Sequence, residues 1–220
     1  MNISRKAKHL AIVGRSGTGK TTLAITQVLG QGHDRVVIAD HEGEFSERLH
    51  VPLCTDWSAF YSALETQRVI CLDITEVAPG QTLETFDELA KQTLDLAKSV
   101  FDGKGMTVLF VIDEVQKYTS TSTVPENFKT LVETGRKWGV DTLSISQRPN
   151  KIHGDLLEQF TEIFFFQLKN PRSHIFGEYY GVTADEQMNL SEGEYLYLNQ
   201  RTDRRSRDRL WPEGKKIVVA

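Results

Sequence analysis

The sequence predicts an α/β protein in which helices flank a mostly parallel central sheet. Apolar segments typical of strands alternate along the chain with segments typical of amphipathic helices. Several of the apolar segments show little polar alternation, as expected for strands that are buried on both faces. Alternating strands and helices require right-handed crossovers, which give a parallel sheet. No repeat or linker divides the 220 residues. We therefore expect a single domain over residues 1–220, with a core at about 9–200 and a basic C-terminal extension at 201–220.

The predicted strands are rich in Val, Ile, Leu and Phe, and they are His9–Gly14, Arg35–Asp40, Arg68–Ile74, Thr107–Asp113, Asp141–Gln147 and Thr161–Leu168. The predicted helices lie between them and are Lys20–Leu29, Trp57–Glu65, Thr82–Phe101, Pro125–Trp138 and Gly154–Phe160. Near the C-terminus, Glu194–Leu198 and Lys216–Val219 are expected to be edge strands, joined by an arginine-rich segment as a hairpin or excursion.

Charge is distributed unevenly along the chain. The chain carries 26 basic and 30 acidic residues, a net charge of −4, yet residues 201–220 hold seven basic residues against three acidic ones. An acidic body does not attract a polyanion through its overall field. Any contact with nucleic acid must therefore be local, and Arg201–Arg209 is the richest basic segment.

The sequence lacks a disulfide framework and a long apolar run, and both absences bear on the expected location of the protein. The two cysteines, Cys54 and Cys71, are too few for a disulfide framework. No run of about 18 apolar residues is present, so we expect no transmembrane segment and a cytoplasmic location.

The strongest motif follows the first predicted strand and fits G-x-x-x-x-G-K-[ST]. Glycines let such a loop curl around phosphates, and the helix that follows adds its positive N-terminal dipole. We predict that Lys20 reaches the β- and γ-phosphates and that the Thr21 hydroxyl binds Mg²⁺. The residues predicted to bind ATP are Gly14, Arg15, Ser16, Gly17, Thr18, Gly19, Lys20, Thr21 and Thr22.

Polar side chains end two other predicted strands. Asp113 and Glu114 follow an apolar strand, where the first carboxylate would hold Mg²⁺ and the second would act as the base for an attacking water. Gln147 ends another strand, which Pro149 stops. Because the carboxyl ends of parallel strands converge on a ligand, Gln147 is expected between Asp113 and the phosphate loop, within reach of the γ-phosphate or the water.

Taken in order, these motifs resemble those of the HerA–FtsK superfamily of DNA-pumping ATPases. The likeness covers about residues 9–200. Beyond the two ATPase motifs, it rests on three stretches: Ile38–Phe45, which resembles D-P-x-G-E-[YF]; Gly135–Pro149, which resembles R-x-x-G-I-x…T-Q-R-P; and Leu190–Glu194, which resembles L-x-x-G-E. One departure is His41, which stands where the family usually has proline.

The resemblance implies a P-loop NTPase fold of the RecA/ASCE type and an ATPase that translocates double-stranded DNA. It also implies a homo-oligomeric ring, commonly a hexamer, with ATP held between subunits. The neighbouring subunit would supply an arginine finger, for which Arg136 is the first candidate, Arg148 the second and the tail arginines the third.

Within the superfamily, a bare core of this size looks like the genome-packaging ATPases of tailless icosahedral viruses with internal membranes. That likeness implies a viral protein in the host cytoplasm or at the virion vertex. A capsid-vertex protein or a membrane-associated portal protein is then a possible partner.

Three other functions compete with a packaging motor. A nucleoside or nucleotide kinase would share the phosphate loop, and Arg201–Arg209 resembles an arginine-rich lid, but a kinase lid normally precedes the last core strand. A cellular or plasmid HerA-like DNA-processing ATPase would carry the same motifs. A degenerate ATPase could serve as an assembly or DNA-clamping subunit, although here every catalytic position is filled.

Overall fold

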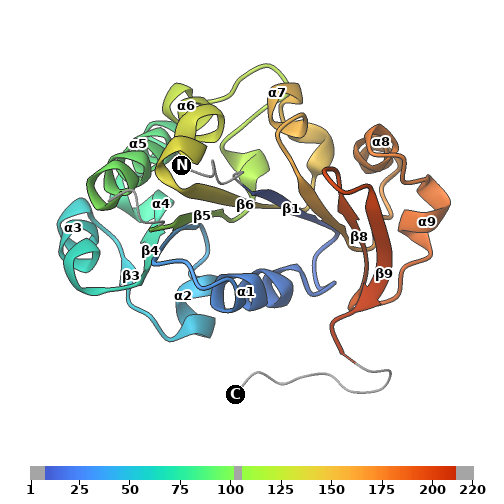
Figure 1. Ribbon diagram of the computed structural model, residues 1–220, viewed down its shortest axis with the longest axis horizontal. Coiled ribbons are helices and arrows are strands. Elements are labelled where there is room, and N and C mark those ends of the chain that lie inside the picture. The colour runs from blue at the N-terminus through green and yellow to red at the C-terminus, as the bar shows by residue number, and fades with distance from the viewer. Residues whose placement is uncertain (1–7, 102–105, 212–220) are drawn as a thin grey trace, which may run out of the picture.

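The computed structural model describes residues 8–101 and 106–211. In that part of the chain, nine strands form a single sheet in the order β3-β4-β2-β5-β6-β1-β7-β8-β9 (Figure 1). The strands from β3 to β7 in this order are parallel, whereas β8 and β9 are antiparallel to their neighbours. Their bounds are β1 His9–Val13, β2 Arg35–Asp40, β3 Leu53–Cys54, β4 Val69–Asp73, β5 Val108–Ile112, β6 Val140–Ser146, β7 Glu162–Phe165, β8 Glu194–Asn199 and β9 Arg204–Arg209.

Helices cover both faces of the sheet. In Figure 1, α1 and α2 lie below the sheet, and α5, α6 and α7 lie above it. The α-helices are α1 Lys20–Gly30, α2 Glu44–Leu49, α3 Trp57–Thr66, α4 Ile74–Val77, α5 Thr82–Val100, α6 Glu126–Thr134, α7 Gly154–Leu157, α8 Pro171–Tyr179 and α9 Ala184–Met188. Three 3₁₀ turns are η1 Val115–Lys117, η2 Gly135–Trp138 and η3 Pro149–Lys151. No helix in the described ranges is long and apolar enough to cross a membrane.

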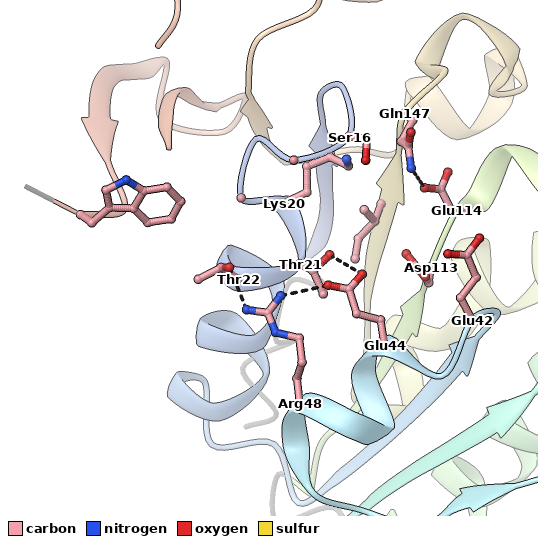
Figure 2. Close-up of a pocket in the computed structure, with 14 residues that line it drawn as sticks. Ser16, Lys20, Thr21, Thr22, Glu42, Glu44, Arg48, Asp113, Glu114 and Gln147 are labelled. Atoms are coloured by element: carbon pink, nitrogen blue, oxygen red, sulfur yellow. Dashed lines mark hydrogen bonds and ion pairs between the residues drawn. The ribbon is translucent and has the colours of Figure 1, made fainter. Parts of the chain in front are cut away.

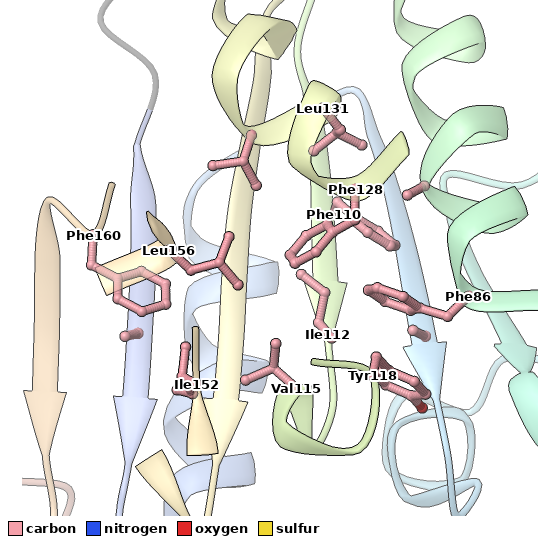
Figure 3. Close-up of a cluster of buried hydrophobic side chains, with 14 of the residues drawn as sticks. Phe86, Phe110, Ile112, Val115, Tyr118, Phe128, Leu131, Ile152, Leu156 and Phe160 are labelled. Atoms are coloured by element: carbon pink, nitrogen blue, oxygen red, sulfur yellow. The ribbon is translucent and has the colours of Figure 1, made fainter. Parts of the chain in front are cut away.

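The larger core, on the α5–α6 face, includes a stack of aromatic side chains (Figure 3). The Phe86 ring lies parallel to the Tyr118 ring, with centroids 4.3 Å apart, and meets Phe128 edge-on at 5.0 Å. Phe110 of β5 also stacks against the Phe86 ring, with centroids 5.9 Å apart. Tyr118 comes directly after η1, so this packing anchors the turn that follows β5, where the acidic pair lies.

The structure confirms the predicted fold class and the six predicted core strands. It adds short elements that carry little periodicity, including β3, α2 and α9.

The arginine-rich segment was expected to connect two edge strands, but it is itself the outer strand, β9, paired with β8 from Glu194 to Asn199. The expected hairpin is therefore present, formed by β8 and β9. The prediction that the segment only connects two strands was wrong, because an edge strand that is open to solvent is held by backbone hydrogen bonds and needs no apolar side chains. The segment Lys216–Val219 lies outside the described residues.

Candidate nucleotide-binding site

A cavity of about 400 Å³ opens at the carboxyl edge of the parallel strands, above the start of α1 (Figure 2). Such an edge is where parallel α/β sheets bind their ligands. The cavity is lined by Ser16, Gly17, Gly19, Lys20, Thr21, Thr22, Glu42, Glu44, Arg48, Asp113, Glu114, Ile145, Gln147 and Trp211. The structure thus brings together the phosphate loop, the acidic pair and the end of β6, which are far apart in sequence.

The phosphate loop is tied to the strands on both sides of β1. The Gly14 nitrogen donates to the Ser146 carbonyl (3.1 Å), and the Arg15 nitrogen donates to the Gln167 carbonyl (2.9 Å). Within the loop, the Thr18 hydroxyl donates to the Arg15 carbonyl (2.9 Å). These bonds shape the loop without using the backbone nitrogens nearest to α1, which can then face an anion.

Lys20 begins α1, and its side chain is buried beneath the loop. The Nζ atom donates a hydrogen bond to the Arg15 carbonyl, 3.0 Å away. Burial lowers the pKa of Lys20 from its ordinary value, while the Glu114 and Asp113 carboxylates act in the opposite direction. The lysine is therefore placed inside the loop, with two carboxylates nearby.

A polar contact between α1 and α2 forms the lower wall of the cavity (Figure 2). The Thr21 hydroxyl donates to Glu44 Oε2 (3.2 Å), and Arg48 bridges Glu44 (3.0 Å) and the Thr22 hydroxyl (2.9 Å). The position of α2 follows from buried Asp40 at the end of β2, whose carboxylate accepts from the Ser46 nitrogen (2.8 Å). Arg48 had no part in the sequence-based prediction, and Glu44 entered it only as the glutamate of the stretch Ile38–Phe45.

His41, the departure from the family pattern, follows β2 directly. Its ring meets the Tyr118 ring edge-on, with centroids 6.4 Å apart. Burial lowers the pKa of His41 from its ordinary value, and Lys117 adds to this effect. The imidazole therefore takes the place of proline as a neutral side chain packed against the turn that follows β5.

Asp113 and Glu114 follow β5 and are both buried. Burial, together with the negative charge of Glu114, raises the pKa of Asp113 to about 7. Glu114 has a left-handed backbone (φ 54°), an uncommon conformation for a residue with a side chain. Its carbonyl accepts from the Lys117 nitrogen (2.7 Å), which closes the turn of η1.

Two glutamine amides hold the Glu114 carboxylate. Gln147 Nε2 donates to one carboxylate oxygen and Gln116 Nε2 donates to the other. Gln116 in turn accepts from the Ser146 hydroxyl (2.6 Å), which links the turn after β5 to the end of β6. Gln147 was expected at this edge, between Asp113 and the phosphate loop. In the structure it follows β6, which lies between β5 and β1 in the sheet. Gln116 was missed, and its only signal in the sequence was its place two residues after Glu114.

The end of β9 forms another wall of the cavity that the sequence did not predict. The Gly193 nitrogen donates to the Thr18 carbonyl (3.2 Å), and the Leu210 nitrogen donates to the Gly193 carbonyl (2.9 Å). A side chain at position 19 would be strained by the φ of 103°, and its Cβ would lie 2.5 Å from the Leu210 side chain and 3.1 Å from the Trp211 ring, so both would have to move. The residues after β9 are therefore part of the site.

The three groups of candidate finger arginines lie in different places. Arg136 is exposed in η2, before the amino end of β6, whereas the cavity lies at the carboxyl end of that strand. The seven residues of β6 span roughly 23 Å, so Arg136 does not reach the cavity of its own chain. Arg148 follows Gln147 at the cavity edge.

Two tail arginines form ion pairs within the chain. Arg205 binds Glu186, and Arg207 Nε lies 2.7 Å from Glu194 Oε1. These pairs join β9 to α9 and β8.

Few protein groups are available to hold a metal. No group of three or more His, Cys, Asp or Glu residues within residues 8–101 and 106–211 could bind a metal ion. Near the loop, the oxygen ligands expected from the sequence are the Thr21 hydroxyl and the Asp113 carboxylate. This donor set fits Mg²⁺, which is usually bound through one or two protein oxygens together with phosphates and waters.

The phosphate loop, the buried lysine and the strand-end acidic pair define a P-loop ATPase. The AAA domain family matches residues 3–142, and the protein belongs to this family.

The fold is similar to that of several solved ATPases. The DNA-packaging ATPase B204 of Sulfolobus turreted icosahedral virus is 18% identical (TM-score 0.73), and the similarity covers 95% of this chain and 98% of that chain. The packaging NTPase B204 of Sulfolobus turreted icosahedral virus 2, solved with ATPγS, is 16% identical (TM-score 0.72; 92% and 97% covered). The bacterial conjugative coupling protein TrwB is 11% identical (TM-score 0.68; 92% and 84% covered).

These likenesses confirm the predicted fold, which the protein shares with two viral packaging NTPases and a conjugative coupling protein. No curated protein matches the sequence significantly.

Proposed function

We propose that this protein is an ATP-hydrolysing motor that translocates double-stranded DNA and packages a viral genome into a preformed capsid. The observation that carries the proposal is the cavity that unites the phosphate loop with Asp113, Glu114 and Gln147. The fold supports it, since the similar folds described above include two viral packaging NTPases over nearly the full length of both chains.

In the proposed reaction, a water attacks the γ-phosphorus of ATP, and the bond to the oxygen that bridges the β- and γ-phosphates breaks. Glu114 accepts the proton of the water, and Gln147 orients the water or the γ-phosphate. Lys20 neutralises charge on the β- and γ-phosphates. The backbone of residues 14–19 and the side chains of Thr21 and Thr22 hold the rest of the triphosphate.

Thr21 and Asp113 would hold Mg²⁺, which supplies positive charge to the phosphate oxygens. The hydrogen bond between Thr21 and Glu44 fits this arrangement, because it orients the hydroxyl toward the acidic side of the cavity. Glu44 is itself held by Arg48, so the position of the hydroxyl depends on α2 as well as on α1.

The motor is proposed to act as a homo-oligomeric ring, most simply a hexamer, with ATP between subunits. Arg136 does not reach the cavity of its own chain, so in this arrangement it would act on the ATP held by a neighbouring subunit. Arg148 is the alternative finger. In the packaging role, the ring would dock on a capsid vertex or on a membrane-associated portal protein.

The test is phosphate release by the purified full chain with Mg²⁺–ATP, with and without duplex DNA, and in separate reactions with added nucleosides. Stimulation by duplex DNA supports the motor. A phosphorylated nucleoside in place of free phosphate would instead support a kinase. Nucleotide binding without turnover in either reaction would indicate a DNA-clamping or assembly subunit. Packaging and a cellular or plasmid DNA-processing role are separated by binding to capsid-vertex preparations.

A further inference from the structure

A second cavity, of about 310 Å³, adjoins the nucleotide cavity. Glu42, Glu114 and Gln147 line both cavities, so these side chains form a wall between them. The second cavity also holds three cationic side chains, Lys117, Arg148 and Lys151. This positive charge lies beside the proposed base, and only Arg148, the alternative finger, has been given a role in the hydrolysis described above.

Two of these three cations have no ion-pair partner in the described ranges. Lys117 Nζ lies 3.4 Å from Glu42 Oε1, while neither the Arg148 guanidinium nor the Lys151 ammonium forms an ion pair there. The tail differs, since Arg205 and Arg207 are neutralised by Glu186 and Glu194. The arginine-rich strand therefore offers less unpaired positive charge than its composition indicates, whereas the second cavity holds two cations, Arg148 and Lys151, that are unpaired within the described part of the chain.

The backbone holds Arg148 and Lys151 at one rim. The Arg148 nitrogen donates to the Ser146 hydroxyl (3.0 Å), and the Lys151 nitrogen donates to the Arg148 carbonyl (2.9 Å). Pro149 between them is buried, and the Asn150 side chain accepts from the Ser173 hydroxyl of α8 (3.3 Å). The two cations are thus presented by a short turn that is fixed to the end of β6 and to α8.

The same turn is connected to the proposed base. Arg148 follows Gln147, which donates to the Glu114 carboxylate. The Ser146 hydroxyl, which accepts from the Arg148 nitrogen, donates to Gln116, the second amide that holds Glu114. Displacement of Arg148 would therefore act on both hydrogen bonds to the Glu114 carboxylate.

We propose that the second cavity binds a backbone phosphate of duplex DNA through Lys117, Arg148 and Lys151, and that Gln147 and Gln116 transmit this contact to Glu114. The proposal rests on the DNA-translocating function and adds the place where DNA is sensed.

The side chains of the second cavity suit a phosphate that is part of DNA. Arginine donates two parallel hydrogen bonds to phosphate, and lysine supplies a point charge. Glu42 and Glu114 disfavour a free anion here, whereas DNA that is held elsewhere along the ring delivers its phosphates at high effective concentration.

The test compares full-length variants with one lost cation each. Lys151→Gln changes a residue of the second cavity that does not line the nucleotide cavity. Lys91→Gln on α5 and Arg207→Gln on β9 are matched controls with the same change of charge. For each variant, the affinity for a duplex DNA of mixed sequence is measured over a range of salt concentrations, and ATPase activity is measured with and without that DNA.

We expect Lys151→Gln to keep its basal ATPase activity and to bind DNA roughly tenfold more weakly at 0.1 M salt, with a salt slope lower by about one. Gln116→Ala is expected to keep its DNA affinity and to lose the increase in kcat that DNA causes. If Gln116 had only a structural role, Gln116→Ala would lower the DNA affinity or the stability of the protein, and not only the increase in kcat that DNA causes.

Three results would overturn the proposal. Weaker DNA binding by Arg207→Gln, with Lys151→Gln and Lys91→Gln unaffected, would place the contact on β9 instead of in the second cavity. Inorganic phosphate is also added to the ATPase assays. If Lys151→Gln binds DNA normally but its ATPase activity is inhibited less by phosphate than that of the wild type, the cavity is a site for free phosphate. Normal DNA stimulation in both Lys151→Gln and Gln116→Ala would remove the sensing role while leaving the motor intact. If the wild-type protein neither binds DNA nor is stimulated by it, the proposed function fails as well.

Discussion

The backbone nitrogen of Gly193 donates a hydrogen bond to the carbonyl oxygen of Thr18, so a residue at the start of the last hairpin holds the phosphate loop in place. Gly193 has a positive φ of 75°, and a Cβ at this position would lie 2.6 Å from the Trp211 ring. Gly193 is the glycine of Leu190–Glu194, one of the stretches that resemble the HerA–FtsK pattern. Its positive φ and its close approach to Trp211 give a physical reason for a glycine at this position.

Replacing Gly193 with alanine should therefore affect both folding and nucleotide binding. We expect Gly193→Ala to lower the free energy of unfolding by more than about 1 kcal/mol, the cost of a left-handed backbone alone. We also expect a higher KM for ATP. Gly80→Ala is the control, because Gly80 has a similar φ (83°) and a Cβ there would meet no atom within 4 Å. Thermal unfolding and ATPase assays that show equal effects for the two variants would contradict the proposed contact.

Lys20→Ala should abolish ATP turnover and weaken nucleotide binding, because the charge on the β- and γ-phosphates loses its buried partner. Lys91→Ala, at an exposed position on α5, should behave like the wild type. Turnover by steady-state phosphate release and affinity by titration with ATP are the measurements. Near-normal turnover by Lys20→Ala would remove the phosphate-loop assignment.

Glu114→Gln should retain ATP binding and lose hydrolysis by about 10²-fold or more, as expected for a positioned base. ATP-bound assemblies should accumulate and be detectable by size-exclusion chromatography with labelled ATP. Glu65→Gln on α3 makes the same chemical change at an exposed position and serves as the control. Normal hydrolysis by Glu114→Gln would mean that another group accepts the proton, and the kinase alternative would gain support.

Arg136→Ala should be inactive alone and should recover activity when it is mixed with Glu114→Gln subunits. In a mixed ring, some interfaces combine an intact glutamate from one chain with an intact arginine from its neighbour. Activity is measured over a series of mixing ratios. The absence of recovery at every ratio would argue against a role in trans for Arg136, and the same series with Arg148→Ala would then test the alternative.

The ion pair between Arg207 and Glu194 gives β9 a dependence on pH. The Arg207 hydrogen bond holds the pKa of Glu194 at about 2, below its ordinary value of 4.5. A depressed carboxyl pKa stabilises the fold above the ordinary pKa, and this contribution disappears as pH falls from about 4.5 toward 2. We expect Arg207→Ala to lose up to about 1 kcal/mol at neutral pH and less in acid. Unfolding by urea at pH 7 and at about pH 2.5 measures this difference.

Much of the fold could be predicted because its strongest signals are local. The apolar runs of β2 and β5 mark buried strands, and the glycine spacing of residues 14–21 marks the loop. The pairing of distant elements leaves weaker traces. Glu44 reaches Thr21, and Trp211 reaches the loop, only because α2 and β9 pack where they do, and no periodicity in the sequence encodes these contacts.

The C-terminal strand β9 is a case in which a strong signal in the sequence led to the wrong structure. Its arginines attract attention as a basic cluster, and their composition predicts a polar connection that could contact DNA. In the structure, their backbone completes the sheet, and two of their side chains are used in ion pairs. Neither use could be predicted without knowing that β8 and α9 lie beside the segment.

The position of Trp211 also makes the nucleotide cavity optically visible. Its indole ring lines that cavity, whereas Trp57 begins α3 and Trp138 ends η2, on elements that do not line it. We therefore expect the intrinsic fluorescence of the unmodified chain to change as ATP binds and leaves, with the other two indoles as a constant background. Replacing Trp211 with phenylalanine would remove the signal while keeping an aromatic ring against the loop.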